Sequence, residues 1–439
     1  MNRIAYLICL FVISSSLSAA APKKKRPTPK FQPNPKRLNP APGVVVPSAV
    51  KAELSAGVAS LGKEIARLRN SLAKRPELLR LLPDVQIFHN AVRYVLADDI
   101  FTSANQFKSA RTLLELGLTR ARQLAADQAP WNTATGPVVR GYISKIDGSV
   151  QPYGILVPDS YRPGGKPMRL DFWLHGRGDT LNEIAFLDGQ LKGRSQFKPD
   201  SAFVLEPYGR FMNAFKFAGE IDVFEALEHA ATCYPIDRER IAMRGFSMGG
   251  AGAWHLGAHH PDAFASVNPG AGFVDVKNYQ KLTDKLDTIP WYEQRLWTMY
   301  DPLACPINLI NSTLVAYSGE DDAQKAAADL MEAALERDGV KMTHIIGPKT
   351  GHRYEPGAKV IVAKLVDEAT NRGIKHQPAK VTLVTHTLKW NKAHWVTIDR
   401  LKEHWKEARI DAERTGRGVN ITTRNIAALS LDLPNGTPV

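Results

Sequence analysis

The sequence predicts an α/β protein built on a mostly parallel β-sheet with helices on both faces. Between about residues 138 and 373, short runs of β-branched and aromatic residues alternate with helix-like stretches, as in successive βαβ units. Two strands around a tight turn precede this alternation, and a helical region precedes both. Sheets of this kind form their sites at the carboxyl ends of the strands, so function is expected in the residues that follow each strand.

Composition is that of a soluble globular protein, with 44% hydrophobic and 23% charged residues. The net charge of +13 suggests a nucleic-acid partner, but seven basic residues lie between Lys23 and Arg37, ahead of the first acidic residue, Glu53. No basic stripe with interleaved aromatic residues follows. We therefore predict no nucleic-acid binding.

The first 20 residues predict a cleaved export signal. Arg3 supplies a positive charge, residues 4–13 form an apolar core, and small residues follow, with cleavage expected after Ala20. Because the apolar run is too short to span a bilayer, no integral membrane segment is expected after cleavage. The protein is expected to be secreted or periplasmic. Residues 21–47 hold eight prolines and predict an extended linker.

Residues 48–130 predict a helical region. Six apolar residues recur at alternating steps of four and three, which places them along one side of a helix. They are Leu54, Val58, Leu61, Ile65, Leu68 and Leu72. A second long helix is predicted over residues 99–126. One reading is a coiled-coil arm for self-association; a helical hairpin that packs on its own chain is favoured because the repeat is short.

Residues 138–373 predict the sheet domain. A hairpin opens it, with strands at 140–146 and 151–157 around the turn signal Asp147-Gly148. Further strands are predicted at 170–174, 202–205, 241–243, 264–267, 313–317 and 343–346, with helices at 219–231, 250–259, 322–336 and 358–370.

Residues 374–439 predict a small β-rich region with strands at 380–388, 394–398 and 426–433. The sequence stops just past the turn signal Asn435-Gly436. A truncated reading frame and an incomplete module both fit this ending.

The clearest chemical signal is Gly245-Phe-Ser-Met-Gly249, which follows a predicted strand and opens a helix. This G-x-S-x-G pattern puts a serine on a sharp strand-to-helix turn, where glycines remove clashes and Oγ projects above the sheet edge. The helix that begins at Met248 directs free N–H groups at negative charge formed there. Ser247 is the predicted nucleophile.

A serine nucleophile needs a base, an orienting acid and donors for the oxyanion. The expected order is serine, acid, histidine. The loop after strand 313–317 contains Glu320, Asp321 and Asp322, and the loop after the last strand contains His352. We predict His352 as the base and Asp322 as the acid. Glu320 and Asp321 are the alternative acids, and a helix N-cap is the alternative role for Asp322.

The oxyanion donors are expected to be the backbone N–H groups of Met248 and Arg177. Arg177 lies in the glycine-rich loop Leu174-His-Gly-Arg-Gly-Asp179, which follows the first parallel strand. The side chain of Arg177 is expected to pair with Asp179 or to lie at the surface, and contact with an acidic substrate group is the rival reading.

At these residues the chain resembles the α/β-hydrolase superfamily, in particular secreted prolyl-oligopeptidase-like and feruloyl- or acetylxylan-esterase-like serine hydrolases. The resemblance is carried by residues 245–250, His175-Gly176, residues 319–322 and Gly351-His352, and it covers residues 138–373. It implies a Ser-Asp-His hydrolase with no metal or organic cofactor. Prolyl oligopeptidases carry a β-propeller ahead of the hydrolase domain, where this chain has only helices, so esters are ranked above peptides.

The predicted function is therefore a secreted serine hydrolase that cleaves small-molecule or polysaccharide carboxylic esters through an acyl-enzyme. A serine peptidase of prolyl-oligopeptidase type is the alternative. The rival from a different class is a non-catalytic scaffold whose outer regions bind an envelope or polysaccharide partner. The ordered triad argues against it.

Three further sets of residues leave alternatives. Between Gly272 and Cys305, aromatic residues that include Trp291 and Trp297 either line a substrate pocket or pack a helical cap. Cys233 and Cys305 either form a disulfide or, as favoured, remain two buried thiols. His255 and His259 are four residues apart but lack the glutamate of a zinc motif, so helix packing is favoured over metal binding.

Overall fold

The computed structural model describes residues 42–193 and 195–433. The predicted export signal and most of the predicted linker lie outside these residues. The described part of the linker, residues 42–47, has no regular secondary structure, and the first helix begins at Ser48. Among the helices of the described ranges, none combines the length and the apolar character needed to cross a membrane.

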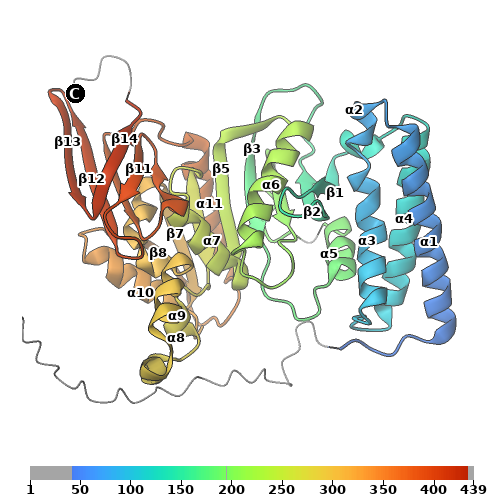
Figure 1. Ribbon diagram of the computed structural model, residues 1–439, viewed down its shortest axis with the longest axis horizontal. Coiled ribbons are helices and arrows are strands. Elements are labelled where there is room, and N and C mark those ends of the chain that lie inside the picture. The colour runs from blue at the N-terminus through green and yellow to red at the C-terminus, as the bar shows by residue number, and fades with distance from the viewer. Residues whose placement is uncertain (1–41, 194, 434–439) are drawn as a thin grey trace, which may run out of the picture. The chain divides into compact units, whose positions relative to one another are not determined.

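An eight-stranded sheet forms the centre of the fold (Figure 1). Its strands are β1 (Gly136–Ile143), β2 (Val150–Val157), β3 (Met168–Leu174), β4 (Ala202–Pro207), β5 (Ile236–Phe246), β6 (Ser266–Gly270), β7 (Thr313–Gly319) and β8 (Thr343–Gly347). They lie in the order β1-β2-β4-β3-β5-β6-β7-β8. The pairs β1–β2 and β2–β4 are antiparallel, and every other neighbouring pair, from β4–β3 to β7–β8, is parallel. The predicted hairpin and mostly parallel sheet are confirmed.

Helices cover both faces of this sheet. Those of the sheet domain are α5 (Glu183–Leu191), α6 (Ala218–Cys233), α7 (Met248–His259), α8 (Val276–Tyr279), α9 (Trp291–Leu296), α10 (Lys325–Glu336) and α11 (Pro356–Arg372). Met243 of β5 packs into the core that contains α6 and α7, whereas its neighbour Ala242 packs with Val362 and Val366 of α11. Successive side chains of a strand point to opposite faces, so β5 is buried on both sides.

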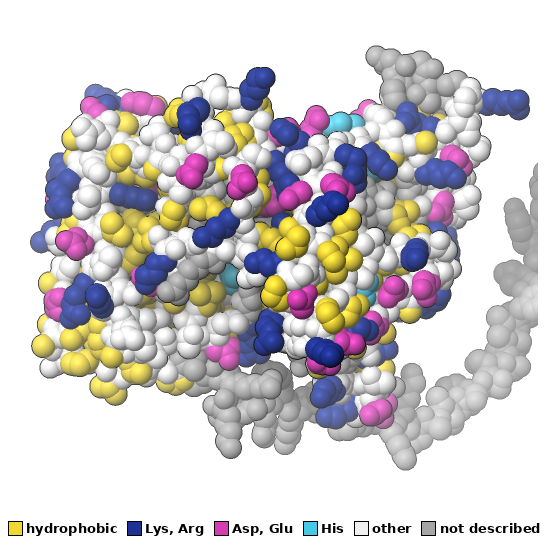
Figure 2. Space-filling view, turned by 180° about the vertical axis from the view of Figure 1, so that it is seen from behind, with side chains coloured by type: hydrophobic (Ala, Val, Ile, Leu, Met, Phe, Trp, Pro, Cys, Tyr) yellow, Lys and Arg dark blue, Asp and Glu magenta, His cyan; other side chains and the backbone are white. Residues whose placement is uncertain are grey.

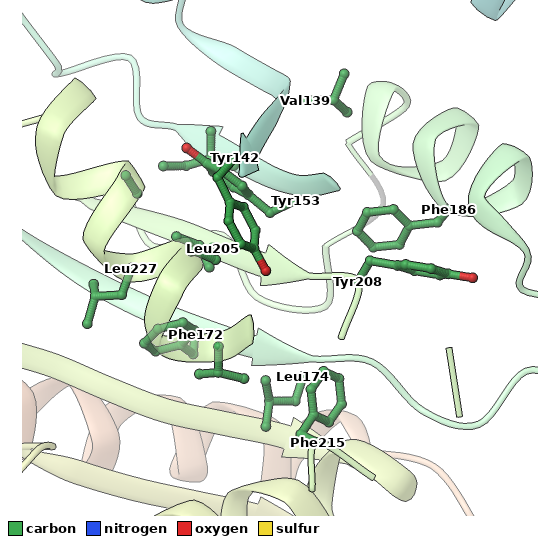
Figure 3. Packing of buried hydrophobic residues seen from close by; sticks show 14 of the residues in the cluster. Val139, Tyr142, Tyr153, Phe172, Leu174, Phe186, Leu205, Tyr208, Phe215 and Leu227 are labelled. Carbon is green, nitrogen blue, oxygen red and sulfur yellow. The ribbon is translucent and has the colours of Figure 1, made fainter. Parts of the chain in front are cut away.

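The core extends across several elements of the sheet domain (Figure 3). Phe186 of α5 lies against Tyr208, with ring centroids 5.0 Å apart, and Phe215 lies beside Leu174 at the end of β3. Short 3-10 turns link the longer elements. They are η1 (Pro130–Asn132), η2 (Thr283–Thr288), η3 (Trp297–Met299), η4 (Pro302–Ala304), η5 (Pro306–Asn311) and η6 (Leu388–Trp390).

The helical region is a three-helix bundle. The prediction of a two-helix hairpin therefore missed one helix. Helices α1 (Ser48–Ser71), α3 (Pro83–Ala97) and α4 (Asn105–Ala125) pack on one another, and the short α2 (Pro76–Leu79) joins the first two. Of the predicted seam, Leu61 and Leu68 are fully buried within this chain. The helix predicted from residue 99 begins later, because Asp99 adopts a φ of 51°, which a helix cannot accommodate.

A buried ion pair joins the bundle to the sheet. Arg140 of β1 and Asp84 of α3 are 0% and 1% exposed, with Nη2 and Oδ2 3.0 Å apart. Asp84 also accepts hydrogen bonds from the N–H of Gly141 at 2.8 Å and from Trp131 Nε1 at 2.9 Å. Burial by itself would raise the pKa of Asp84, but Arg140 and Arg120 hold it below its ordinary value. The bundle and the sheet therefore share a polar contact that is closed to solvent.

Residues 380–431 form two three-stranded sheets, β10-β11-β14 and β13-β12-β9. Their strands are β9 (Lys380–Thr385), β10 (Lys392–Ala393), β11 (Val396–Leu401), β12 (Ala408–Thr415), β13 (Gly418–Arg424) and β14 (Ile426–Leu431). The expected β-rich region is confirmed, although β12 and β13 were not predicted. In β12 the buried Ala408, Ile410 and Ala412 alternate with charged residues, a period-two pattern that is weak because two of the three apolar side chains are small. Most side chains of β13 are exposed, so that strand has no clear apolar pattern.

Charges are mixed over the molecular surface seen in Figure 2. Lys and Arg side chains are interspersed there with Asp and Glu, and hydrophobic side chains lie between them. This face therefore presents no extended field of one sign.

Candidate active site

Ser247 occupies a strained turn between β5 and α7. Its backbone has φ 59° and ψ −121°, and its N–H donates to the carbonyl of Gly270 at 2.8 Å. A Cβ added at Gly245 would lie 2.2 Å from the carbonyl oxygen of Gly249, and one at Gly249 would lie 1.9 Å from that of Leu174. Only glycine fits these two positions. The crowding of strand against helix holds the serine in a conformation that costs about 1–3 kcal/mol.

The structure brings the predicted serine, histidine and acid together. His352 Nε2 lies 2.8 Å from Ser247 Oγ, and His352 Nδ1 lies 2.7 Å from Asp322 Oδ2. The three residues follow β5, β8 and β7, so each stands at the carboxyl end of its strand. The Asp322 side chain is only 4% exposed, whereas that of His352 is 41% exposed. The site thus has a buried acid and a histidine open to solvent.

The geometry distinguishes Asp322 from the two acids before it. Glu320 accepts the backbone N–H of Lys349 at 2.7 Å, and Asp321 is exposed. Among the described residues, only Asp322 of these three contacts His352. Asp322 is also not the N-cap of α10, which is Gln324; its Oδ1 accepts the Gln324 N–H at 2.9 Å.

The loop after β3 runs beside the serine. A Cβ added at Gly176 would lie 3.5 Å from the Cβ of Ser247, so Arg177 follows a point of close approach. The N–H groups of Arg177 and Met248 have no hydrogen-bond acceptor among residues 42–193 and 195–433. Both are therefore free to donate to a ligand. The Arg177 side chain pairs with Asp179 at 2.8 Å and is 61% exposed, as the sequence suggested.

His175 fixes the start of this loop from inside the protein. Its Nδ1 lies 3.0 Å from the carbonyl oxygen of Gly176, its Nε2 lies 3.0 Å from that of Tyr208, and burial lowers its pKa. The ring of Phe215 packs against it edge-on, with centroids 5.1 Å apart. The half-buried imidazole links the ends of β3 and β4.

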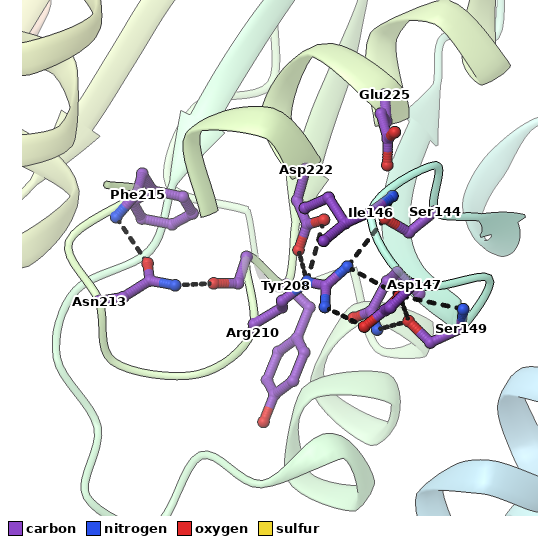
Figure 4. Close-up of polar contacts among 12 residues, drawn as sticks. Ser144, Ile146, Asp147, Ser149, Tyr208, Arg210, Asn213, Phe215, Asp222 and Glu225 are labelled. Carbon is purple, nitrogen blue, oxygen red and sulfur yellow. Dashed lines mark hydrogen bonds and ion pairs between the residues drawn. The ribbon is translucent and has the colours of Figure 1, made fainter. Parts of the chain in front are cut away.

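The segment after β4 is strained in a way that sequence reasoning missed. Five residues other than glycine have positive φ there: Arg210, Phe211, Ala214, Phe215 and Phe217. The Arg210 guanidinium binds Asp147 at 2.7 Å and Asp222 at 2.9 Å (Figure 4). Asn213 donates to the Gly209 carbonyl and accepts the N–H of Phe215. Ordinary side chains at these positions gave no signal, and the ion pairs of Arg210 join it to residues 63 and 12 positions away.

The two tryptophans assigned to a pocket lie in the insertion between β6 and β7. Trp291 begins α9, is 66% exposed, and has Tyr292 as its ring neighbour at 5.9 Å; Trp297 is half-buried. Among the described residues, neither forms a hydrogen bond or ring contact with the Ser247–His352–Asp322 group. Tyr279 lies near the Arg177 side chain: the pKa of Arg177 is raised mainly by the hydrogen bond that it donates to Asp179 and further by Tyr279.

Both cysteines of the described residues are free thiols. Cys233 is half-buried next to Arg140, with Sγ and Nη2 3.3 Å apart. Cys305 is buried, and burial raises the pKa of its thiol to about 12. The two thiols are separate, as favoured, but only Cys305 is buried, whereas two buried thiols were expected.

The histidines of α7 take part in packing. His255 and His260 both bind Glu220 of α6, at 2.9 and 3.0 Å, and His259 is buried against Trp390, with ring centroids 4.2 Å apart. Elsewhere in the described ranges, Asp329, Glu332 and His344 bring three ligand-type atoms within 4.8 Å of one another. The Lys325 ammonium already binds that Asp329 carboxylate at 2.7 Å.

Comparison with known proteins agrees with this geometry. Residues 216–368, which hold Ser247, Asp322 and His352, match the model of the Prolyl oligopeptidase family, over less than half of the chain. No curated protein matches the chain in sequence.

Similar solved structures include S-formylglutathione hydrolase from Staphylococcus aureus, with 17% identity, a TM-score of 0.41, and coverage of 53% of this chain and 100% of that one. A ferulic acid esterase has 18% identity and a TM-score of 0.39 over 53% of this chain and 96% of that one. Acylaminoacyl peptidase from Pyrococcus horikoshii has 16% identity and a TM-score of 0.41 over 55% of this chain and 42% of that one.

Three observations indicate the kind of protein: the order of the strands, the strained turn at Ser247 and the family match. They support a serine hydrolase of prolyl-oligopeptidase or esterase type. The sheet and its helices form an α/β-hydrolase fold, and residues 216–368 of it match the Prolyl oligopeptidase family.

Proposed function

We propose that the protein hydrolyses carboxylic esters through Ser247, His352 and Asp322. The observation that carries the proposal is the continuous hydrogen-bonded line from Ser247 Oγ through both ring nitrogens of His352 to Asp322 Oδ2. This is the arrangement that a serine needs to become a nucleophile at neutral pH.

In the acylation step, His352 Nε2 accepts the proton of Ser247 as Oγ attacks the ester carbonyl carbon. Asp322 accepts the Nδ1–H hydrogen bond, which fixes the tautomer and stabilises the imidazolium. The free N–H groups of Met248 and Arg177 are suited to stabilise the oxyanion of the tetrahedral intermediate. His352 then donates its proton to the leaving alcohol oxygen, and Ser247 keeps the acyl group.

Deacylation repeats the sequence with water as the nucleophile. His352 Nε2 accepts a proton from the water, which attacks the acyl carbonyl, and returns that proton to Ser247 Oγ as the acid leaves. Every proton transfer passes through one imidazole, so no metal or organic cofactor is required.

A polysaccharide carrying acyl esters is the substrate class we favour. The 41% exposure of His352 supports an open site that accepts bulky substrates. The exposed indole of Trp291 offers a flat apolar face on which a sugar ring can stack. We assign Trp291 and Trp297 to substrate binding. We also propose that the protein is exported, since such polymers are extracellular. Peptide hydrolysis is the second candidate, because the matched family is one of peptidases.

A substrate panel tests this proposal. We expect hydrolysis of p-nitrophenyl acetate and of acetylated xylan, little cleavage of alanyl or prolyl p-nitroanilides, and no activity in Ser247→Ala. Trp291→Ala should raise KM for the polymer and leave p-nitrophenyl acetate nearly unchanged. Anilide cleavage without esterase activity would replace the proposal by the peptidase reading. Equal losses on both esters would remove Trp291 from substrate binding.

A further inference from the structure

Tyr317 of β7 lies at the junction of the three active-site loops, although it touches none of the reacting atoms. Its side chain is 1% exposed. Its hydroxyl donates to the carbonyl of Arg353 at 2.8 Å and accepts the N–H of Glu355 at 2.8 Å. Arg353 directly follows His352, so one phenol group satisfies two backbone groups of the histidine loop.

The backbone around Tyr317 reaches the other two loops. Its carbonyl accepts the N–H of Ala271 at 2.9 Å, and the preceding Gly270 accepts the N–H of Ser247 at 2.8 Å. Two residues after Tyr317, the Gly319 carbonyl accepts the N–H of Asp322 at 3.2 Å. Serine, histidine and acid are thus each connected to β7 within one or two hydrogen bonds.

The surroundings leave room for this hydroxyl. A Cβ added at Gly347, the last residue of β8, would lie 2.4 Å from the Tyr317 oxygen. The ring is held in place by Tyr354, whose ring stacks on it with centroids 4.2 Å apart and planes 22° apart. The hydroxyl therefore has a fixed position, and a glycine is required beside it.

We infer that Tyr317 is a positioning residue that sets the distance between His352 and Ser247; this inference rests on the proposed function. Without its hydroxyl, the Arg353 carbonyl and the Glu355 N–H lose their partner, and the loop relaxes toward other donors and acceptors. A displacement of about 1 Å in a catalytic group costs roughly 100-fold in rate. Since Tyr317 does not touch substrate, kcat should fall while KM is retained.

The test compares Tyr317→Phe with Tyr354→Phe. The two rings stack on each other, but the buried Tyr354 hydroxyl lies near Asn268 and forms no hydrogen bond with the described residues of the histidine loop. Each change removes one hydroxyl and keeps the ring. The readouts are kcat and KM on p-nitrophenyl acetate and the rate of covalent labelling by a fluorophosphonate, at a temperature where circular dichroism shows both variants folded.

We expect Tyr317→Phe to lower kcat and the labelling rate by about 10- to 100-fold with KM unchanged, and Tyr354→Phe to stay within about twofold of the wild type. Equal rates in the two variants, or a loss confined to KM, would overturn the inference alone. A wild type that does not label would overturn the proposed function, and the inference with it.

A second pair covers the case in which Tyr317→Phe does not fold. Glu355 has a φ of −74°, which suits proline, so Glu355→Pro removes the same N–H without altering the phenol. Glu355→Ala is its control, because both lose the side-chain cap on the Ala358 N–H. We expect kcat to be lower in Glu355→Pro than in Glu355→Ala, and equal values would contradict the role of Tyr317.

Discussion

Asp322 is the last of three consecutive acidic residues, and only its side chain reaches His352. Asp321 is exposed, and Glu320 accepts a backbone N–H from Lys349. Successive residues of a loop point in different directions, so the order of the strands places the acidic loop beside the histidine without choosing among its members. The chain thus provides its own matched control for the acid.

We expect Asp322→Asn to lower kcat by about 1,000- to 10,000-fold, because an amide cannot hold the productive tautomer of His352. Asp321→Asn should change kcat by less than about twofold, since its side chain is exposed. Steady-state hydrolysis of p-nitrophenyl acetate measures both. A large loss of kcat in Asp321→Asn with a small loss in Asp322→Asn would show that Asp322 is not the acid.

At the level of single residues, the sequence predicts those whose role requires a recognisable local motif. Gly245 and Gly249 are needed because any side chain would overlap a carbonyl oxygen, and that need is visible as G-x-S-x-G. Tyr317 and the strained segment at residues 210–217 left no such trace. Their contacts join positions far apart in sequence, and one tyrosine in a strand resembles any other.

Helix α5 was the one long element of the sheet domain that the sequence did not predict. It packs on α3, α4, β1 and β2 and so connects the bundle to the sheet. Its apolar residues Ile184, Leu187 and Leu191 have helical spacing, but the helix is short and Phe186, off that line, is buried as well, so the pattern is weak. Packing against both the bundle and the sheet stabilises α5. Strand β13 escaped prediction for a different reason, because most of its side chains are exposed.

The first residue of α5 gives this junction a pH dependence. Glu183 Oε2 is buried without a partner among the described residues, and burial, opposed by Arg93, raises its pKa to about 8. The folded state therefore holds a proton that the unfolded chain releases near pH 4.5. Stability from this group is full below that pH and is lost as the pH rises to about 8, by at most about 5 kcal/mol.

We expect Glu183→Gln to be more stable than the wild type at pH 9 and to match it at pH 4.5. The difference in Tm between the two proteins, measured at several pH values, isolates this group from the other titrating residues. Asp188→Asn is the control on the same helix, since Asp188 lies near the surface with Lys192. Parallel Tm curves for wild type and Glu183→Gln would contradict a buried, protonated carboxyl.

At the scale of the whole molecule, residues 380–431 are bound into the sheet domain by buried polar contacts. Asn308 is 2% exposed; its Nδ2 donates to the carbonyls of Ala258 and Val384 at 2.9 Å, and its Oδ1 accepts the Val384 N–H at 2.7 Å. Trp390 Nε1 donates to Glu220 at 2.9 Å. The sequence predicted the helical, central and β-rich regions in order, but the contacts of Asn308 with Val384 and of Trp390 with Glu220 cross 76 and 170 residues and leave no local pattern.

These contacts predict that the described regions unfold together. Asn308→Ala leaves the N–H and carbonyl of Val384 unpaired in a buried place and should lower the free energy of unfolding by about 2–4 kcal/mol. Differential scanning calorimetry should show one transition for the wild type, shifted as a whole in the variant. Two transitions, of which Asn308→Ala moves only one, would show that the β-rich region folds independently.

The central claim is that Ser247 attacks substrate, and covalent labelling tests it most directly. The full-length protein is treated with a fluorophosphonate, and the modified residue is located by peptide mass spectrometry, alongside Ser247→Ala with its fold checked by circular dichroism. The account predicts one adduct per chain, on Ser247, and none in the variant. An adduct on another serine, or no adduct on a folded wild type, would contradict it.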